Sequence, residues 1–493
     1  MAILRNDLNG KRKRGDYEQV KNTGFGNEMN VVLGGGFAGL AAGYVLAKAQ
    51  KKVAVVEKDP VFGGLSRTIK HDGFKFDLGG HRFLTKDIKI ENFVKDLMSD
   101  GYLVVPRTSQ IYMRGSFFDY PLTPTNALFG MGIPTTAHIL YDYFKEIIGS
   151  KINPREIISL EDWVVSKFGR KMFDLYFKQY SEKVWGIDCK EISAEWVANR
   201  IKGLSMWEAI KNALVKFSGK EITTLADQFL YPNNGIGVIS DAMSSRIAAA
   251  GGNSLMTGTN VTRINCEKFR IKSVDVENGQ DRDSLHGGNF LSSIPLPELV
   301  KLMNPAPPAD IVAAADQLSY RDLTVVTVML DCDRATDLTW MYLPEKDIAV
   351  GRIHEPKNWS PHMAPEGKTS IVAEYFCFKG DNVWNSSGEE LTGTTVGCLK
   401  KLGFVKDSEV LGTCIVRVPK AYPLFSVGFR EPLNKIMNYL KNFDNLKVIG
   451  RTGTFDYLNM DLAIKSGIDA AEEVLDVNSG KFAGAGASGE INT

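Results

Sequence analysis

The sequence is poor in the features that would place it in a small, secreted or metal-stabilised class of protein. Its 493 residues include only six cysteines, with no CxxC pair and no Cys/His cluster. Neither a disulfide framework nor a zinc site is therefore expected, and we expect no bound metal. Free thiols favour a reducing compartment, so the cytoplasm is the predicted location. The cysteines are Cys189, Cys266, Cys332, Cys377, Cys398 and Cys414.

The sequence also lacks an excess of charge of one sign. Its 59 Lys and Arg residues are balanced by 58 Asp and Glu residues, for a net charge of +1. A near-neutral chain is not expected to bind nucleic acid or an anionic membrane through its overall field. The most membrane-like run, residues 31–47, is uncharged but rich in glycine and a little short for a span. We therefore expect no membrane span, and no leader predicts a secretory signal.

The composition that is present is typical of a globular protein, with 44% hydrophobic and 24% charged residues. The length predicts two or more domains. Residues 1–29 form an N-terminal extension that we expect to be flexible. Residues 478–493 are rich in Gly, Ala and Ser and are predicted to be a disordered tail.

The most specific motif lies near the N-terminus. An apolar run at 30–33 predicts a buried strand, and Gly34, Gly36 and Gly39 follow it in the order GxGxxG, at the start of a helical pattern. The first glycine permits a tight turn, the second lets a pyrophosphate approach the backbone, and the third lets helix and strand pack closely. A second apolar strand ends in Glu57, where a carboxylate accepts hydrogen bonds from a ribose. A Gly-rich turn alone would be weak, but the whole unit predicts dinucleotide binding.

Two further glycine pairs favour FAD over NAD. Gly63-Gly64 precedes Ser66-Arg67, and Gly79-Gly80 precedes His81. Together with the segments at 260–266, 291–300 and 446–453, these motifs resemble the FAD superfamily of amine oxidases, protoporphyrinogen oxidases, phytoene desaturases and UDP-galactopyranose mutases. The helix after 453 could also be a surface amphipathic helix, but its position after a strand and a glycine favours contact with the flavin. The resemblance implies that FAD contacts Gly34, Gly36, Phe37, Ala38, Gly39, Glu57, Lys58, Gly64, Ser66, Arg67, Gly79, Gly80, His81, Val261, Gly450, Arg451, Met460, Asp461 and Ala463.

The predicted fold class is α/β, with a discontinuous Rossmann-type FAD-binding domain. A mainly helical substrate or cap domain and a substrate domain that contains a β-sheet are inserted into it, since the two insertions differ in periodicity. The FAD-binding domain is expected at 30–105, 225–305 and 440–477, the helical domain at 106–224, and the sheet domain at 306–439.

Within this superfamily, the sequence resembles the mutases most closely. Lys183, Trp185 and Arg200 match their K-x-W element and the arginine that follows it, and Tyr176 falls where the eukaryotic mutases stack an aromatic ring on uracil. Arg352 begins a stretch that resembles the mutase element R-I-x-E-x-K, and the resemblance implies that this arginine binds the nucleotide diphosphate.

The last mutase-like element is "GRTGTFDYLNMD". It aligns Arg451 and Tyr457 with an arginine and a tyrosine that bind pyrophosphate, and Tyr422 lies near the spacing of a phosphate-binding tyrosine. Two departures put the base and the sugar in doubt. Leu122-Thr123 follow Tyr120-Pro121 in place of an aromatic residue and glutamine, and Asn459 replaces the aspartate of bacterial mutases.

The arginines and tyrosines form a set suited to two phosphates, because a guanidinium presents a permanent charge and a fork that matches phosphate oxygens. The alternative is that each arginine is a routine surface charge. His81 is expected beside the flavin edge, although a histidine after two glycines can also simply fill a packed turn. Candidate catalytic residues are His81, Arg200, Arg352 and Arg451, and candidate substrate-binding residues are Tyr176, Trp185, Tyr422, Tyr457 and Asn459.

The resemblance implies an FAD-dependent isomerase that interconverts pyranose and furanose forms of a nucleotide-diphosphate hexose, with UDP-galactose as the first substrate to test. In that reaction the N5 atom of reduced flavin attacks the anomeric carbon, and NAD(P)H is a candidate external reductant. The substrate partner is a sugar nucleotide, and a homo-oligomer is compatible with the sequence. Two alternatives stay open: an FAD oxidoreductase of the protoporphyrinogen oxidase or amine oxidase type, and a catalytically silent sugar-nucleotide-binding subunit.

Overall fold

A computed structural model describes residues 28–98, 101–120, 132–200 and 228–478. Almost all of the N-terminal extension that the sequence predicts to be flexible, and of the C-terminal tail that it predicts to be disordered, lies outside this description, as do Pro121, Leu122 and Thr123.

Five parallel strands form the central sheet, in the order β20-β13-β1-β2-β9. Every residue of β1 (Asn30–Leu33) and β2 (Val53–Val56) is buried, as expected for a parallel sheet with both faces covered. The other strands are β9 (Ser254–Met256), β13 (Asn289–Ser292) and β20 (Leu446–Val448). The sheet therefore joins three segments that are far apart in the sequence, and the predicted α/β fold class is confirmed.

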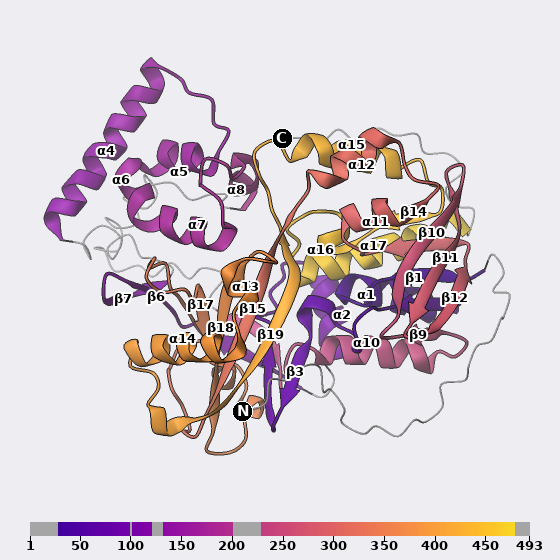
Figure 1. The fold of residues 1–493 in the computed structure, drawn as a ribbon, viewed down its shortest axis with the longest axis horizontal. Coiled ribbons are helices and arrows are strands. Elements are labelled where there is room, and N and C mark those ends of the chain that lie inside the picture. Colours follow the sequence, from indigo (N-terminus) through magenta and orange to yellow (C-terminus); the bar gives the residue numbers. More distant parts are fainter. Residues whose placement is uncertain (1–27, 99–100, 121–131, 201–227, 479–493) are drawn as a thin grey trace.

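Three helices pack around this sheet (Figure 1): α1 (Phe37–Lys48), α10 (Val238–Ala249) and α17 (Met460–Asn478). Helices α1 and α17 approach closely at Gly467, where an added Cβ would lie 2.0 Å from the carbonyl oxygen of Ala38. The first and last helices of the fold are thus packed together, and both begin beside the ends of the central strands.

A second, seven-stranded sheet has the order β19-β15-β18-β17-β16-β6-β7. Strands β15 (Tyr320–Leu330) and β18 (Thr369–Cys377) are buried along their whole length, and helix α14 (Gly388–Lys401) lies on one face (Figure 1). The sheet is completed by β6 and β7, which come from a segment that the sequence predicts to be mainly helical. The remaining strands are β6 (Ser109–Met113), β7 (Ser116–Tyr120), β16 (Trp340–Tyr342), β17 (Arg352–His354) and β19 (Val410–Pro423).

The helices between residues 133 and 200, here called the helical unit, project from the rest of the molecule (Figure 1, upper left). Its helix α5 begins with a capping box, in which Ser159 and Asp162 each bond the other's backbone N–H. The unit contains α4 (Ile133–Ile152), α5 (Leu160–Phe168), α6 (Arg170–Met172), a π-helical turn (Phe173–Phe177), α7 (Lys178–Trp185) and α8 (Ala194–Arg200).

The remaining elements connect these three parts. A four-stranded sheet has the order β12-β11-β10-β14, and β3-β4 and β5-β8 are two-stranded. The bounds are β3 (Thr68–His71), β4 (Phe74–Asp77), α2 (Ile88–Leu97), β5 (Tyr102–Pro106), β8 (Gln228–Pro232), β10 (Asn260–Glu267), β11 (Arg270–Asn278), β12 (Asp281–His286), α11 (Leu296–Leu302), β14 (Met303–Asn304), α12 (Ala309–Asp316), α13 (Asn382–Asn385), α15 (Arg430–Leu440) and α16 (Gly450–Gly453).

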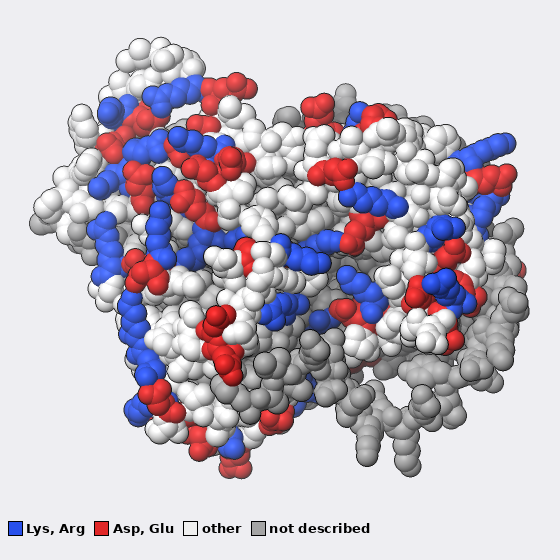
Figure 2. All heavy atoms as spheres, in the orientation of Figure 1, with Lys and Arg blue, Asp and Glu red and all other residues white. Residues whose placement is uncertain are grey.

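The visible surface shows acidic and basic side chains interspersed, without a broad field of one sign (Figure 2). Among the described helices, none is both long enough and apolar enough to cross a bilayer. All six cysteines are free.

Candidate functional site

A cavity of about 610 Å³ opens at the carboxyl ends of the parallel strands. Gly34 follows β1, Glu57 follows β2, Ser293 follows β13 and Gly450 follows β20, and all four line it. This edge of an open parallel sheet is where ligands of α/β proteins bind.

Most of the residues predicted to contact the cofactor are brought together in this cavity. Gly39, Gly79, Gly80 and Asp461 are the exceptions, and they lie behind its wall or outside its lining. Those that line it are Gly34, Gly36, Phe37, Ala38, Glu57, Lys58, Gly64, Ser66, Arg67, His81, Val261, Gly450, Arg451, Met460 and Ala463.

The glycines of the first motif are needed for different reasons. At Gly39 an added Cβ would lie 1.9 Å from the carbonyl oxygen of Gly34, so the protein's own packing requires a glycine. At Gly36 the backbone has an ordinary φ of −76°, and an added Cβ would meet nothing closer than the Cα of Gly64, at 4.0 Å. Protein packing therefore does not require glycine at 36, but a ligand that presses on the backbone would. A pyrophosphate above the N-terminus of α1 fits this position.

The carboxylate of Glu57 can accept hydrogen bonds beyond the two that the protein supplies. Its Oε2 accepts from the backbone N–H of Gly35 (2.7 Å) and its Oε1 from that of Asp59 (2.8 Å). Burial raises the pKa of this carboxyl, and the two N–H donors oppose that shift. Since each oxygen keeps a second lone pair, the carboxylate fits the two hydroxyls of a ribose. The buried Oδ1 of Asp461, outside the lining of this cavity, also has no hydrogen-bond partner among the described residues.

His81 lies on the cavity wall with a buried Nδ1 atom that has no described partner. Burial, with the nearby charges of Arg451 and Arg352, lowers its pKa to about 3. The ring is therefore neutral near pH 7, with one N–H donor and one acceptor nitrogen.

Arg451 lies at the junction of this cavity and a cluster of tyrosines. Its Cζ atom is 4.9 Å from the ring centroid of Tyr457 and 5.5 Å from that of Tyr422, and these two rings stack 5.9 Å apart. The guanidinium donates to the carbonyl oxygens of Leu458 (2.8 Å) and Ala421 (3.4 Å). No carboxylate in the described part of the chain forms an ion pair with it, so its charge is not neutralised there.

Arg352 lies in a different electrostatic setting. Its Nε donates to Oε1 of Glu374 over 2.8 Å, and its Nη2 donates to Oε2 of the same carboxylate. Burial disfavours the charged guanidinium, but Glu374 outweighs that effect and holds the pKa of Arg352 well above its usual range. His354 lies 3.8 Å from Glu374, and burial holds its pKa well below the usual range.

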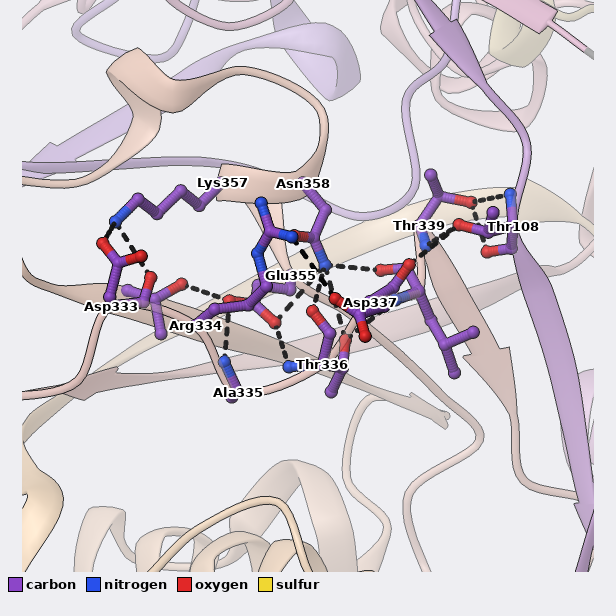
Figure 3. Close-up of polar contacts among 12 residues, drawn as sticks. Thr108, Asp333, Arg334, Ala335, Thr336, Asp337, Thr339, Glu355, Lys357 and Asn358 are labelled. Carbon is purple, nitrogen blue, oxygen red and sulfur yellow. Dashed lines mark hydrogen bonds and ion pairs between the residues drawn. The ribbon is translucent and has the colours of Figure 1, made fainter.

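The rest of the R-I-x-E-x-K element holds a neighbouring loop (Figure 3). Glu355 accepts hydrogen bonds from the backbone N–H groups of Ala335 (3.1 Å) and Thr336 (2.7 Å). Lys357 pairs with Asp333 over 2.6 Å. In this element the arginine pairs with Glu374 and does not line the cavity, whereas the glutamate and the lysine bond to the loop at residues 333–339.

The other predicted substrate residues are spread around this cluster. Trp185 is buried and packs edge-on against Tyr422, with ring centroids 6.4 Å apart. Tyr176 is half-buried in the helical unit, and burial raises its pKa. Asn459 is exposed just before α17. The side chain of Arg200 lies outside the described residues.

Three residues that the sequence did not single out also belong to the group around the candidate substrate residues. Glu374 and His354 surround Arg352, and Tyr180 from α7 packs edge-on against Tyr342 of the sheet at 5.4 Å. A signal for Glu374 was available, because it is the one charged residue in the apolar run "TSIVAEYFCF", and a buried carboxylate requires a partner. The identity of that partner was not evident from the sequence.

Comparisons with known proteins agree on the fold but point to different activities. A family model described as flavin containing amine oxidoreductase matches residues 37–475. The coproporphyrinogen III oxidase of Bacillus subtilis (strain 168) is 23% identical over 84% of this chain and 91% of its own. The crystal structure of a reduced UDP-galactopyranose mutase has a TM-score of 0.79 and 21% identity, and covers 91% of this chain and 94% of its own. Cyclohexylamine oxidase from Brevibacterium oxydans has a TM-score of 0.64 and 13% identity, and covers 92% of this chain and 100% of its own.

Proposed function

The chain belongs to the family of flavin-containing amine oxidoreductases, and we propose that within this family it is a sugar-nucleotide mutase. Its cofactor is FAD. The proposed reaction interconverts the pyranose and furanose forms of a nucleotide-diphosphate hexose, and UDP-galactose is the first substrate to test.

The observation that carries the proposal is Arg451, a cation on the cavity wall beside two stacked tyrosines and without an ion-pair partner among the described residues. A permanent charge that the protein leaves unneutralised at a cofactor site is suited to an anionic substrate. The rings of Tyr422 and Tyr457 lie beside Arg451, and their hydroxyls would supply neutral donors to the same ligand. A diphosphate would use both the charge and the donors.

The protein's part in this reaction is to hold the leaving diphosphate and to keep it from dissociating into solvent. Arg451 would bind the diphosphate as it departs from the anomeric carbon, so that its return remains intramolecular. When bound in its reduced form, the flavin supplies the nucleophilic centre for the exchange of ring forms. The Arg352–Glu374 pair is internally neutralised, so we assign it the orientation of the substrate's polar groups beside the diphosphate.

His81 would contribute a neutral ring at the flavin edge, with one nitrogen donating and the other accepting. Tyr176 and Trp185 would line the nucleotide side of the site, together with Arg200 and Asn459. This assignment of roles follows the sequence motifs, with Trp185 supported by its contact with Tyr422.

A second candidate is an FAD-dependent oxidoreductase, and the 23% identity with a coproporphyrinogen III oxidase over most of both chains favours it. A substrate that carries carboxylates would also pair with Arg451. The two proposals differ in the fate of electrons, since an oxidase reduces its flavin in each turnover and a mutase does not.

Binding experiments on the FAD-loaded protein test the proposal. UDP and UDP-galactose should perturb the flavin spectrum of wild-type protein at saturable concentrations, with UDP competing against the sugar nucleotide. The proposal fails if sugar nucleotides neither bind nor react while a porphyrinogen or an amine drives oxygen uptake.

A further inference from the structure

The ammonium group of Lys183 lies in a cage of main-chain oxygens. Its Nζ donates to the carbonyl oxygens of Glu345 (2.6 Å), Ile348 (2.7 Å) and Leu343, and the carbonyl oxygen of Val350 is 3.4 Å away. These four carbonyl oxygens, here called the carbonyl cage, all belong to the loop at residues 343–350. An ammonium has three N–H donors, so the cage can satisfy all of them.

Proteins can bind a dehydrated monovalent cation with a ring of main-chain carbonyl oxygens, which replace its shell of water. Neighbouring acidic side chains are engaged elsewhere: Glu345 accepts from the backbone N–H of Arg114, and Asp347 pairs with Lys401. Burial lowers the pKa of Lys183 to about 8, so its amine keeps its proton at pH 7. The ammonium is thus hydrogen-bonded by main-chain carbonyls, while the carboxylates of Glu345 and Asp347 favour its charge only from a distance.

The cage connects two parts of the protein. Lys183 lies in the last turn of α7, which belongs to the helical unit, whereas the cage leads directly into β17. Val350 precedes Arg352 by two residues, and Gly351 between them donates its N–H to the carbonyl oxygen of Glu374 over 2.9 Å. The position of the cage therefore fixes the start of the strand that carries Arg352.

A second cation secures the same turn of α7. Buried Arg321 donates to the carbonyl oxygens of Val184 (3.0 Å) and Lys183 (3.3 Å), and to that of Phe376 in β18 (2.9 Å). Arg321 thus joins the last main-chain carbonyls of helix α7 to β18, and the Lys183 side chain joins the helix to the loop before β17. Both strands carry members of the Arg352–Glu374 pair.

We propose that Lys183 is a positioning residue whose ammonium fills a monovalent-cation site in the loop 343–350, and so fixes the helical unit against the strand that presents Arg352. The contribution to a sugar nucleotide site rests on the proposed function. The cation site itself does not depend on which substrate the enzyme takes.

Chemical rescue provides the test. In Lys183→Ala, the missing side chain leaves a path to the cage for a small ammonium ion, whereas Lys183→Met fills that path with an uncharged chain. Both FAD-loaded variants should show faster amide hydrogen exchange in residues 343–350, by about tenfold for loss of a charge-assisted hydrogen bond. Methylammonium should restore protection in Lys183→Ala only. Tetramethylammonium, which has no N–H donor, should not restore it in either variant.

The matched control is Lys178→Met, on the same helix, where the lysine lies 4.0 Å from Glu182 and no described bond joins it to the sheet. This variant should keep wild-type exchange in residues 343–350. Unchanged exchange in Lys183→Met, or equal rescue by methylammonium and tetramethylammonium, would overturn the proposal.

Wild-type protein supplies a measurement that does not depend on folding of a variant. Under native conditions at pH 7, limited acetylation followed by mass spectrometry should label Lys183 at least tenfold more slowly than Lys178, because a caged ammonium is partly buried and all three of its N–H donors are bonded. Equal labelling would contradict the cage.

These readouts need no substrate, so they can succeed even if the mutase proposal fails. If both hold, KM for the sugar nucleotide should rise more than kcat falls in Lys183→Ala, with methylammonium reversing the change.

Discussion

Arg352 and Glu374 face each other across strands β17 and β18 and form a two-pronged ion pair. The carboxylate is fully buried, whereas the guanidinium side chain is 20% exposed. The charge of Arg352 is therefore offset before any ligand arrives, while Arg451 keeps a charge that no described carboxylate offsets. Of these two arginines, Arg451 is the one expected to attract a diphosphate.

Breaking the buried pair should destabilise the fold. Glu374→Gln removes the carboxylate and leaves Arg352 with a buried, unpaired charge, which typically costs about 3–5 kcal/mol. Urea unfolding of the FAD-loaded protein would measure the loss. The control is Asp347→Asn, which breaks an exposed pair with Lys401 and should leave the unfolding midpoint unchanged. Equal midpoints for Glu374→Gln and the wild type would show that the pair does not stabilise the fold.

Gly36→Ala should separate cofactor binding from folding. Its added methyl meets no protein atom closer than 4.0 Å, so unfolding of the apoprotein should be unchanged. The same methyl should collide with bound FAD and weaken its binding by about 1–3 kcal/mol, as overpacking does. Flavin fluorescence titration would measure the affinity. The comparison variant is Gly39→Ala, which should instead destabilise the apoprotein because its Cβ would lie 1.9 Å from a carbonyl oxygen.

Arg451→Ala should weaken sugar-nucleotide binding by about 1.5–3 kcal/mol, roughly ten- to hundredfold, because a charge-assisted contact disappears. Arg451→Lys should restore only part of this loss, since an ammonium cannot make a two-pronged contact. Tyr457→Phe should show a smaller loss, because only one neutral hydrogen bond is removed. Each variant should still copurify with FAD. If Arg451→Ala loses FAD and a reconstituted form binds nucleotide normally, the arginine serves the cofactor.

The stability of the protein should depend on the titration of Asp77. This buried carboxyl accepts from Thr68 Oγ1 (2.6 Å), Tyr231 Oη (2.6 Å) and the N–H of Ile236 (3.3 Å), yet burial raises its pKa from 3.8 to about 7. Because the folded state binds this proton more tightly, the contribution of Asp77 to the free energy of unfolding is largest below pH 4. It should fall as the pH rises to 7 and stay constant above that, a loss of about 4 kcal/mol.

Urea unfolding at several pH values between 4 and 8, with FAD saturating, would measure this slope. Asp77→Asn should flatten it, whereas Asp281→Asn, at an exposed position in β12, should retain it. A slope that persists unchanged in Asp77→Asn would assign the titration to another group.

The fold class could be predicted from the sequence because its evidence is local. The motif from Gly34 to Glu57 contains a strand, a turn, a helix and a second strand within a short segment, and each element has its own residue pattern. The cavity brings together most of the residues that this motif and its later partners predicted.

The partners of the candidate site residues could not be predicted in the same way, because they depend on strand order. Arg352 lies opposite Glu374 only because β17 and β18 pair antiparallel in that register. Likewise, β6 and β7 join the second sheet through a parallel pairing of β6 with β16, more than 200 residues away. Neither pairing has a local signal, since periodicity indicates a strand but not its neighbour.

The proposed mutase activity rearranges a sugar nucleotide without net electron transfer. The most direct measurement is turnover of UDP-galactofuranose under anaerobic conditions, with the flavin held fully reduced by dithionite and the products separated by chromatography. A mutase should convert it to UDP-galactopyranose over many turnovers, with the flavin still reduced at the end. No conversion of this or another furanose nucleotide, together with flavin reduction and oxygen uptake driven by a porphyrinogen or an amine, would contradict it.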